Sequence, residues 1–303
     1  MTAAAGVELH GHRGARGLLP ENSIVGFREA IRLGVDCIET DIGMSRDGAL
    51  VIHHDRALNP DLARRDGQWI DAPVLLRALT AKELAVYDIG HIKPGTKYAR
   101  KFAAQRPIDD TSIPLLRDLL AMPELASVPK VCLNLEIKTS PLAPDETETP
   151  ERIATALVAL VDKAGFRTRV RIQSFDWRNL IHLRRIAPDI PLGFLTAEEP
   201  WLDNLERGRR GASPWLGGAD LDAFDGSVPR LVRHLGGAYW APYHRRITDA
   251  DVAAAHAEGL RVMAWTVNDG ADMRRLLEAG VDGLITDFPD IGRREIDAFL
   301  KTR

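Results

Sequence analysis

Apolar and polar residues follow one another along this chain in two alternating periods. Short apolar runs, typical of buried strands, occur at residues 7–10, 37–42, 131–137, 169–173, 191–195, 238–241, 261–266 and 283–286. Most of these runs are separated by segments whose apolar positions recur every three to four residues, as in an amphipathic helix, at 21–33, 150–164, 177–186, 228–235, 249–258, 271–279 and 292–300. In the first such segment Ile24, Phe27 and Ile31 share one face, and Gly34 is suited to end the helix.

This alternation predicts an α/β fold, a (β/α)8 TIM barrel, because eight strands are each expected to return through a helix. An open, doubly wound sheet is the competing architecture. It has no support from a Gly-x-Gly-x-x-Gly sequence after a strand, and Gly11 and Gly14 have the wrong spacing. A barrel of about 250 residues plus insertions fits the 303-residue length. We therefore predict a single domain over residues 7–301.

One long segment interrupts the alternation. Asp47-Gly48 is a hairpin signal, and residues 50–52 are expected to return antiparallel to the strand at 37–42. Residues 56–113 are then polar and contain turn sequences such as Asn59-Pro60 and Lys93-Pro94-Gly95. Long irregular loops are uncommon in compact domains and are often functional. We predict that 56–113 is an insertion after the second strand.

Composition and charge exclude some functions. Hydrophobic residues make up 45% and charged residues 27%, which is ordinary for a globular protein. The 40 Lys and Arg against 43 Asp and Glu give a net charge of −3, which does not support nucleic-acid binding. Cys37 and Cys132 are too few for a cysteine zinc site and lie in apolar runs. We expect buried free thiols there, with a disulfide as the less favoured alternative.

Targeting signals are not visible in the sequence. No window approaches the roughly 18 apolar residues of a membrane helix. The stretch from Met1 to Glu8 lacks the basic and apolar regions of a signal peptide. We therefore predict a cytoplasmic protein without a membrane-spanning segment, whose partner is a small-molecule substrate. The sequence does not indicate an oligomeric state.

Residues able to perform chemistry gather where the predicted strands end, and in a barrel the carboxyl ends of the strands form the catalytic face. His12 and Arg13 follow the first strand. An imidazole transfers protons near neutral pH and a guanidinium holds an oxyanion, although such a pair is often only structural. His53 and His54 end the hairpin, and only one of two neighbours should face the barrel mouth. Trp265, at the end of a late strand, either lines a pocket or fills the core.

Three carboxylates suggest a cation site. Glu39 and Asp41 project from one face of a strand and repel each other unless a cation lies between them. Glu136 and Lys138 share a face of another strand, where buried charges need partners. Oxygen-only ligands favour Mg²⁺ or Ca²⁺. A solvated acidic pair and a simple Glu136–Lys138 ion pair stay open as alternatives.

Taken together and in this order, these residues closely resemble the glycerophosphodiester phosphodiesterase family, over about His10 to Asp290. The matching stretches are His12-Arg13-Gly14-Ala15, Leu19-Pro20-Glu21-Asn22-Ser23, Glu39-Thr40-Asp41, Asp47 to Asp55, Leu135-Glu136-Ile137-Lys138, Gln173-Ser174-Phe175, Trp265-Thr266-Val267-Asn268 and Gly280 to Pro289. Ser23 replaces the threonine usual in the family and keeps a hydroxyl.

The resemblance implies a TIM-type barrel with an insertion after the second strand. It also implies hydrolysis of a glycerophosphodiester to sn-glycerol 3-phosphate and an alcohol, with one divalent cation, Mg²⁺ or Ca²⁺. The residues that it implies are His12 and His54 for acid–base catalysis, Glu39, Asp41 and Glu136 as metal ligands, Arg13 and Lys138 for the phosphate, and Trp265 for the glycerol side. His54 is the match because Asp55 follows it, so His53 is expected to point away.

Two alternative functions use the same barrel. A lysophospholipase D or sphingomyelinase D activity should show an apolar, membrane-facing rim, and the long insertion argues against the sphingomyelinase D type. A non-catalytic phosphate-binding barrel should have lost a catalytic histidine or acid, and all are present. The choice of nucleophile (water or the substrate's own hydroxyl) and the histidine that acts as base stay open.

Overall fold

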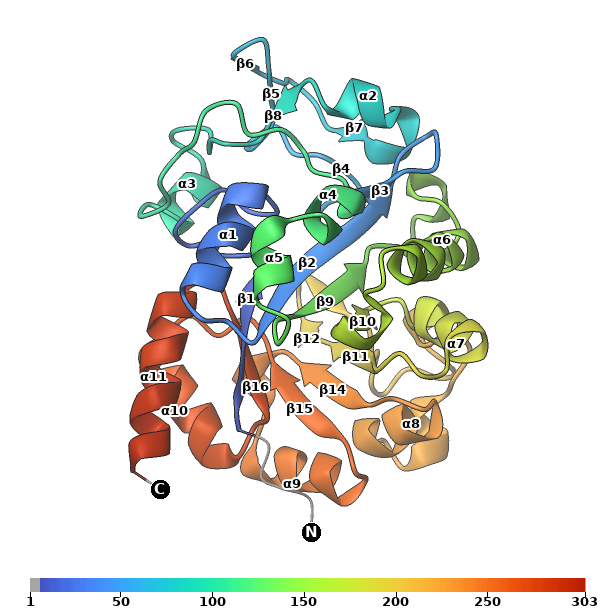
Figure 1. Cartoon of the computed structure of the whole chain (residues 1–303). Coiled ribbons are helices and arrows are strands. Elements are labelled where there is room, and N and C mark those ends of the chain that lie inside the picture. The colour runs from blue at the N-terminus through green and yellow to red at the C-terminus, as the bar shows by residue number, and fades with distance from the viewer. Residues whose placement is uncertain (1–5, 303) are drawn as a thin grey trace.

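Eight parallel strands close into a barrel in the computed structural model, which describes residues 6–302 (Figure 1). Residues 1–5, which make up most of the stretch predicted to lack a signal peptide, lie outside the described part. In order around the ring the strands are β1 (Glu8–His12), β2 (Cys37–Met44), β9 (Cys132–Ile137), β10 (Val170–Ser174), β11 (Leu192–Thr196), β14 (Tyr239–Pro242), β15 (Arg261–Ala264) and β16 (Gly283–Thr286). β16 pairs with β1 and β1 with β2, so the ring is closed. The predicted TIM barrel is confirmed.

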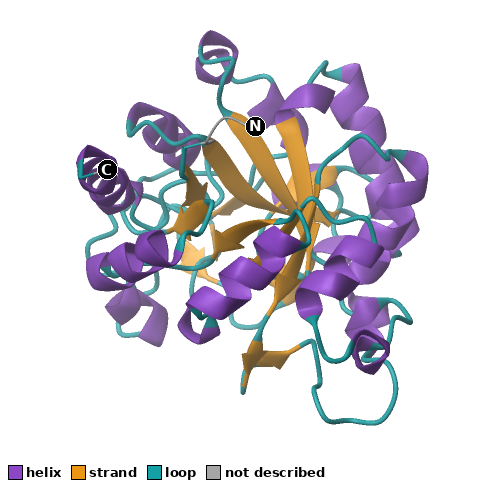
Figure 2. Cartoon of the chain, turned by 90° about the horizontal axis from the view of Figure 1, so that it is seen from below, coloured by secondary structure: helices purple, strands orange, loops and turns teal. Residues whose placement is uncertain are grey.

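Helices surround the strands on the outside of the barrel (Figure 2). They are α1 (Ile24–Arg32), α4 (Leu116–Leu120), α5 (Pro123–Ser127), α6 (Pro150–Lys163), α7 (Trp177–Ile186), α8 (Val228–His234), α9 (Asp249–Ala257), α10 (Gly270–Ala279) and α11 (Pro289–Lys301). The short helices α4 and α5 precede β9 and were not predicted. Ser23 caps α1, because its hydroxyl accepts a hydrogen bond from the Gly26 amide at 3.0 Å. No helix among residues 6–302 is long and apolar enough to cross a membrane.

The hydrophobic core lies mainly between the barrel strands and the helices, and includes Leu9, Phe27, Ile38 and Trp177. A smaller cluster fills part of the lumen, with Tyr239, Met263 and Ile285 among its members. Most of the lumen-facing side chains of β2 and β9 are polar instead. The barrel therefore has a packed wall and a polar interior next to these two strands.

The predicted hairpin is present, since β3 (Leu50–Ile52) runs antiparallel to β2, and the predicted insertion comes after it. The segment that follows contains β4 (Ala57–Leu58), β5 (Arg64–Arg65), β6 (Gln68–Trp69), β7 (Val74–Leu75), β8 (Tyr87–Asp88), α2 (Ala81–Leu84) and α3 (Lys97–Lys101). It has a small core of its own that includes Leu58, Leu76 and Ile113. Figure 1 shows this segment at one end of the barrel. The division of the chain into domains stays a prediction.

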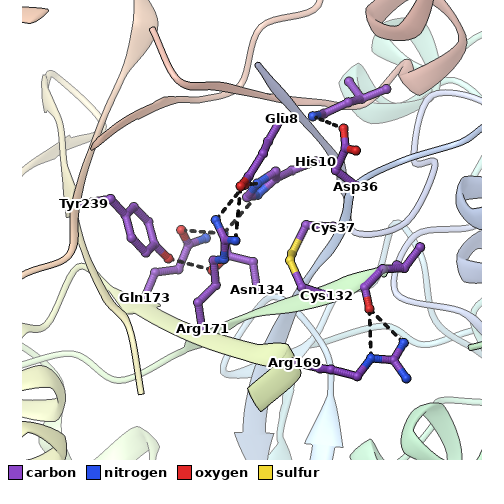
Figure 3. Close-up of a disulfide and its surroundings, with 12 residues drawn as sticks. Glu8, His10, Asp36, Cys37, Cys132, Asn134, Arg169, Arg171, Gln173 and Tyr239 are labelled. Atoms are coloured by element: carbon purple, nitrogen blue, oxygen red, sulfur yellow. Dashed lines mark hydrogen bonds and ion pairs between the residues drawn. A yellow bond between two sulfur atoms is a disulfide. The ribbon is translucent and has the colours of Figure 1, made fainter. Parts of the chain in front are cut away.

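A disulfide joins Cys37 of β2 to Cys132 of β9 (Figure 3). The expectation of free thiols is therefore wrong. The physical reason is the strand register: the two residues face each other directly across the β2–β9 pair, with their Cα atoms 4.5 Å apart. They are 95 residues apart in the sequence, so nothing local shows that they meet.

Buried and half-buried polar side chains lie in the barrel next to this disulfide (Figure 3). Glu8 accepts hydrogen bonds from Arg171 at 2.7 Å and Arg261 at 2.6 Å, and its carboxylate lies 3.0 Å from the His10 ring. Further along the lumen, Asn134 donates to Gln173 at 2.9 Å. These polar groups thus have partners inside the barrel, as buried polar groups require.

Candidate active site

A cavity of about 1040 Å³ opens at the carboxyl ends of the barrel strands. All the site residues predicted from the sequence line this cavity except Asp41, which is fully buried in β2. The lining residues among them are His12, Arg13, Glu39, His54, Glu136, Lys138 and Trp265. The fold thus gathers residues that are spread over more than 250 positions of the sequence.

Three buried carboxylates form one cluster in this site. Glu39, Asp41 and Glu136 each offer an oxygen, and the three oxygens lie within 4.8 Å of one another. The register of β2 against β9 explains this, because Asp41 lies directly opposite Glu136, and Glu39 is two residues earlier on the same face. Burial raises the pKa of Glu39 well above its ordinary value, and the charges of Asp41 and Glu136 raise it further.

The cluster fits a hard divalent cation. All its donors are carboxylate oxygens, which Mg²⁺ and Ca²⁺ prefer. The Oδ1 atom of Asp41 is buried and has no hydrogen-bond partner among the described residues, so it is available as a ligand. A second group of possible cation ligands, Asp88, His91 and Asp109, lies in the insertion. There Arg64 already pairs with both aspartates, which leaves less reason for a cation.

Hydrogen bonds orient the cluster from several sides. The backbone amide of Arg13 donates to Glu39 Oε2 at 3.0 Å, and Gln173 donates to Glu39 Oε1 at 3.2 Å. Asn22 donates to Asp41 Oδ2 at 2.9 Å. Arg13 and Asn22 both have positive φ angles, 53° and 50°. This conformation is unusual for arginine and points to a constraint imposed by the site.

Two cationic side chains lie against the carboxylates. Arg13 bonds Glu21 at 2.8 Å and lies 3.3 Å from Asp41, so its guanidinium is held in place. The Lys138 ammonium lies 2.6 Å from Glu136 and 3.6 Å from Asp41. Burial opposes the charged form of Lys138, but Glu136 and Asp41 outweigh it and raise the pKa of Lys138. The Glu136–Lys138 ion pair, which the sequence left open as an alternative, is therefore present within the same cluster.

The two histidines enter the cavity from different elements. His12 is the last residue of β1 rather than a loop residue, and its Nε2 lies 3.9 Å from Glu39 Oε2. His54 follows β3, and its Nδ1 lies 2.7 Å from Asp55 Oδ1. Its neighbour His53 instead bonds the backbone carbonyl of Asp55, and it does not line the cavity.

Burial and neighbouring positive charges favour the neutral form of both rings. Burial and the positive charge of Arg16 lower the pKa of His12 to about 4. Burial also lowers the pKa of His54, with Arg13 and Lys138 acting in the same direction. The His54 side chain is 33% exposed, so solvent moderates this effect. Each ring can therefore accept a proton.

Aromatic side chains also line the cavity. The ring of Trp265 packs on Phe175 at 5.1 Å and on Tyr243 at 5.3 Å between centroids. Trp201 extends this aromatic group and is 58% exposed. An apolar surface in the same cavity as a charged cluster suits a ligand with one anionic and one less polar part.

Several residues around the site had no role in the sequence-based prediction. Asp287 contacts His12, Arg16 contacts Asp287, and Gln173 and Asn22 contact the carboxylates. Asp287 and Gln173 lie in stretches that matched the family, and both come at the carboxyl ends of barrel strands. That position is the signal that could have identified them.

Comparison with known proteins agrees with this geometry. A model of the glycerophosphoryl diester phosphodiesterase family matches residues 12–291. The chain is 32% identical to the probable glycerophosphodiester phosphodiesterase 2 of Mycobacterium tuberculosis, covering 93% of this chain and 88% of that protein. A crystal structure of a putative glycerophosphoryl diester phosphodiesterase from Silicibacter pomeroyi is 31% identical, with a TM-score of 0.86, and the match covers 98% of this chain and 95% of that one.

A more distant structure shares the fold. It is a phosphodiesterase from Oleispira antarctica in complex with the product sn-glycerol-3-phosphate. It is 22% identical to this chain, with a TM-score of 0.69, and the match covers 96% of each chain.

Proposed function

Because the chain belongs to the glycerophosphoryl diester phosphodiesterase family, we propose that it hydrolyses glycerophosphodiesters to sn-glycerol 3-phosphate and an alcohol, with one divalent cation. The main support is the convergence of three buried carboxylates, two cationic side chains and two histidines on one cavity. The names of the relatives, and the product bound to the Oleispira enzyme, favour this activity over a lysophospholipase D or sphingomyelinase D activity.

Glu39, Asp41 and Glu136 would hold the cation, and their all-oxygen set suits Mg²⁺ or Ca²⁺. When bound, the cation supplies Lewis-acid polarisation of a phosphoryl oxygen. The protein contributes the geometry, because the register of β2 against β9 brings the ligands together before substrate arrives.

Arg13 and Lys138 would bind the phosphate. A phosphodiester is anionic, and negative charge on its oxygens increases as the bond to the leaving group breaks. Arg13 is already fixed by Glu21, and Lys138 by Glu136, so neither has to reorganise in the transition state. Trp265 would offer the glycerol carbons an apolar surface.

His12 and His54 would transfer the protons. One ring, neutral at Nε2, accepts a proton from the attacking hydroxyl group, which belongs to water or to the substrate. The other ring has to enter the reaction protonated at Nε2, and it donates that proton to the leaving oxygen. Such transfers typically contribute about 10²–10⁴-fold each. In both rings Nδ1 is engaged by an aspartate, which leaves Nε2 for the reaction.

The test is release of sn-glycerol 3-phosphate from glycerophosphoethanolamine. We expect activity that is lost on chelation and restored by Mg²⁺ or Ca²⁺. Glu136→Gln should raise the Mg²⁺ or Ca²⁺ concentration needed for half-maximal activity and lower the activity itself, whereas Asp109→Asn, in the second group of possible ligands, should change neither. Turnover that persists in chelator would remove the cation from the proposal. Absence of turnover with any glycerophosphodiester and either ion would refute the activity.

A further inference from the structure

The buried carboxylate of Asp287 contacts His12, a candidate catalytic residue, and is itself held by further side chains. Asp287 follows β16 and is fully buried. Its Oδ1 atom lies 2.7 Å from His12 Nδ1 and 2.6 Å from Arg16 Nε. Its Oδ2 atom accepts from Arg16 Nη2 at 2.9 Å and from Asn268 at 2.7 Å. The carboxylate is thereby fixed at both oxygens, and the His12 ring is fixed against it.

These contacts decide which ring nitrogen of His12 carries the proton. Arg16 Nη2 also lies 3.1 Å from His12 Nδ1, so a guanidinium and a carboxylate compete for one atom. A guanidinium offers only hydrogens and a carboxylate only lone pairs. The carboxylate is the closer at 2.7 Å, and Arg16 Nη2 has Asp287 Oδ2 as its own acceptor. Nδ1 therefore donates to Asp287, and the lone pair of the neutral ring is on Nε2.

The insertion takes part in this arrangement. The Arg16 guanidinium lies over the ring of Phe102, 4.7 Å from its centroid, and Phe102 is 2% exposed. Gln105 donates to the backbone carbonyl of Arg16 at 2.7 Å, and the Arg106 amide donates to that of Leu18 at 2.9 Å. The end of α3 and the residues after it therefore pack on the loop that carries Arg16.

We propose that Asp287, held by Arg16 and Asn268, is a positioning residue that fixes His12 in the Nδ1–H tautomer with Nε2 toward the carboxylate cluster. Phe102 of the insertion holds Arg16 in place for this purpose. The consequence for catalysis rests on the proposed function, whereas the tautomer does not.

The first test is ¹⁵N NMR of wild-type protein labelled at its 9 histidines, near neutral pH. The His12 signals are identified by their absence from the spectrum of His12→Asn. We expect a protonated Nδ1 and an unprotonated Nε2. A protonated Nε2 overturns the proposal. This measurement needs no substrate, so it stands even if the protein hydrolyses no glycerophosphodiester.

The second test is Asp287→Asn, whose amide can donate to Nδ1 and so favour the opposite tautomer. We expect kcat to fall by about 10²–10⁴-fold with KM little changed, the His12 signals to shift toward Nε2–H, and Asp287→Glu to restore part of kcat. Asp282→Asn is the matched control, because Asp282 pairs with His256 at 2.9 Å outside the site. An Asp287→Asn variant with wild-type kcat, or with an unchanged tautomer, overturns the proposal.

The part played by the insertion is tested by Phe102→Leu, which keeps the apolar bulk but removes the aromatic face. We expect a smaller loss of kcat than in Asp287→Asn, without an increase in KM, and broadening or partial shift of the His12 signals. Wild-type kcat together with unchanged His12 signals would show that Phe102 has no part in positioning His12.

Discussion

At the scale of single residues, His53 and His54 are adjacent and yet occupy different environments. The His54 ring lines the cavity and is bound by the Asp55 side chain, whereas His53 is bound to a backbone carbonyl. We therefore expect His54→Asn to lower kcat by about 10²–10⁴-fold. His53→Asn, which keeps a hydrogen-bond donor in place, should have kcat close to that of the wild type. Steady-state assays of the two variants check this, and the opposite order would show that the wrong neighbour was assigned.

A substitution of Lys138 should affect substrate binding and cation binding in different ways. Its ammonium lies beside Glu136 and Asp41, so it repels a cation held there while it attracts a phosphate. Lys138→Met should therefore raise KM for the substrate, and Ca²⁺ affinity measured by calorimetry should be unchanged or stronger. Circular dichroism controls for folding. Wild-type KM would leave Lys138 with only the ion pair to Glu136.

From the sequence it was possible to predict a set of residues that the structure brings together at one cavity, but not the partners of these residues. The residue pairs Glu39–Asp41 and Glu136–Lys138 follow from the two-residue period of a strand. The contact of His12 with Asp287 joins residues 275 positions apart and depends on how β16 closes against β1. No local pattern contains that information.

At the scale of elements, all eight barrel strands could be predicted, because buried strands between amphipathic helices have a clear periodicity. The short helices α4 and α5 were missed, since five residues are too few to show a helical period. The register of β2 against β9 could not be predicted from the sequence either. That register sets both the cation cluster and the disulfide.

The disulfide between β2 and β9 should contribute strongly to stability. In the chain-entropy view, a link that closes a loop of 95 residues is worth on the order of 2–5 kcal/mol. We expect the double variant Cys37→Ser, Cys132→Ser to show a lower free energy of unfolding in urea, by about that amount. Dithiothreitol should lower the stability of the wild type but not of the double variant. Equal stability of the two proteins without reductant would contradict the expectation.

At the scale of the whole molecule, buried histidines should make the fold sensitive to acid. Burial lowers the pKa of His10 and brings that of His12 to about 4, while both titrate near 6.5 in the unfolded chain. At these two histidines the unfolded state thus binds more protons below pH 6.5, so their contribution to stability is lost as pH falls from there toward 4. For His12 the loss is about 3 kcal/mol. Urea unfolding in chelator from pH 7 to 4.5 measures it.

His12→Asn is the control for this pH dependence. Its stability should decline less steeply over the same pH range, because one of the buried groups that take up a proton on unfolding is gone. The same pH dependence of the free energy of unfolding in the wild type and in His12→Asn would show that the His12 ring is not held neutral by the fold.

The location of the protein in the cell stays a prediction. The disulfide is the observation that argues most directly against a cytoplasmic site, since reducing compartments rarely keep such bonds. The thiol content of protein taken directly from its native host would decide the matter.

Cys37 and Cys132 lie on either side of the insertion in the sequence. Their disulfide would therefore hold the two parts of the chain together after a cut within the insertion. A protease that cuts at the exposed Pro94-Gly95 turn would produce two fragments that migrate as one band in electrophoresis until a reductant is added. One fragment would carry Glu39 and Asp41 and the other Glu136, still side by side. The same tether would let evolution lengthen, shorten or replace the intervening segment without separating the two halves of the cation site.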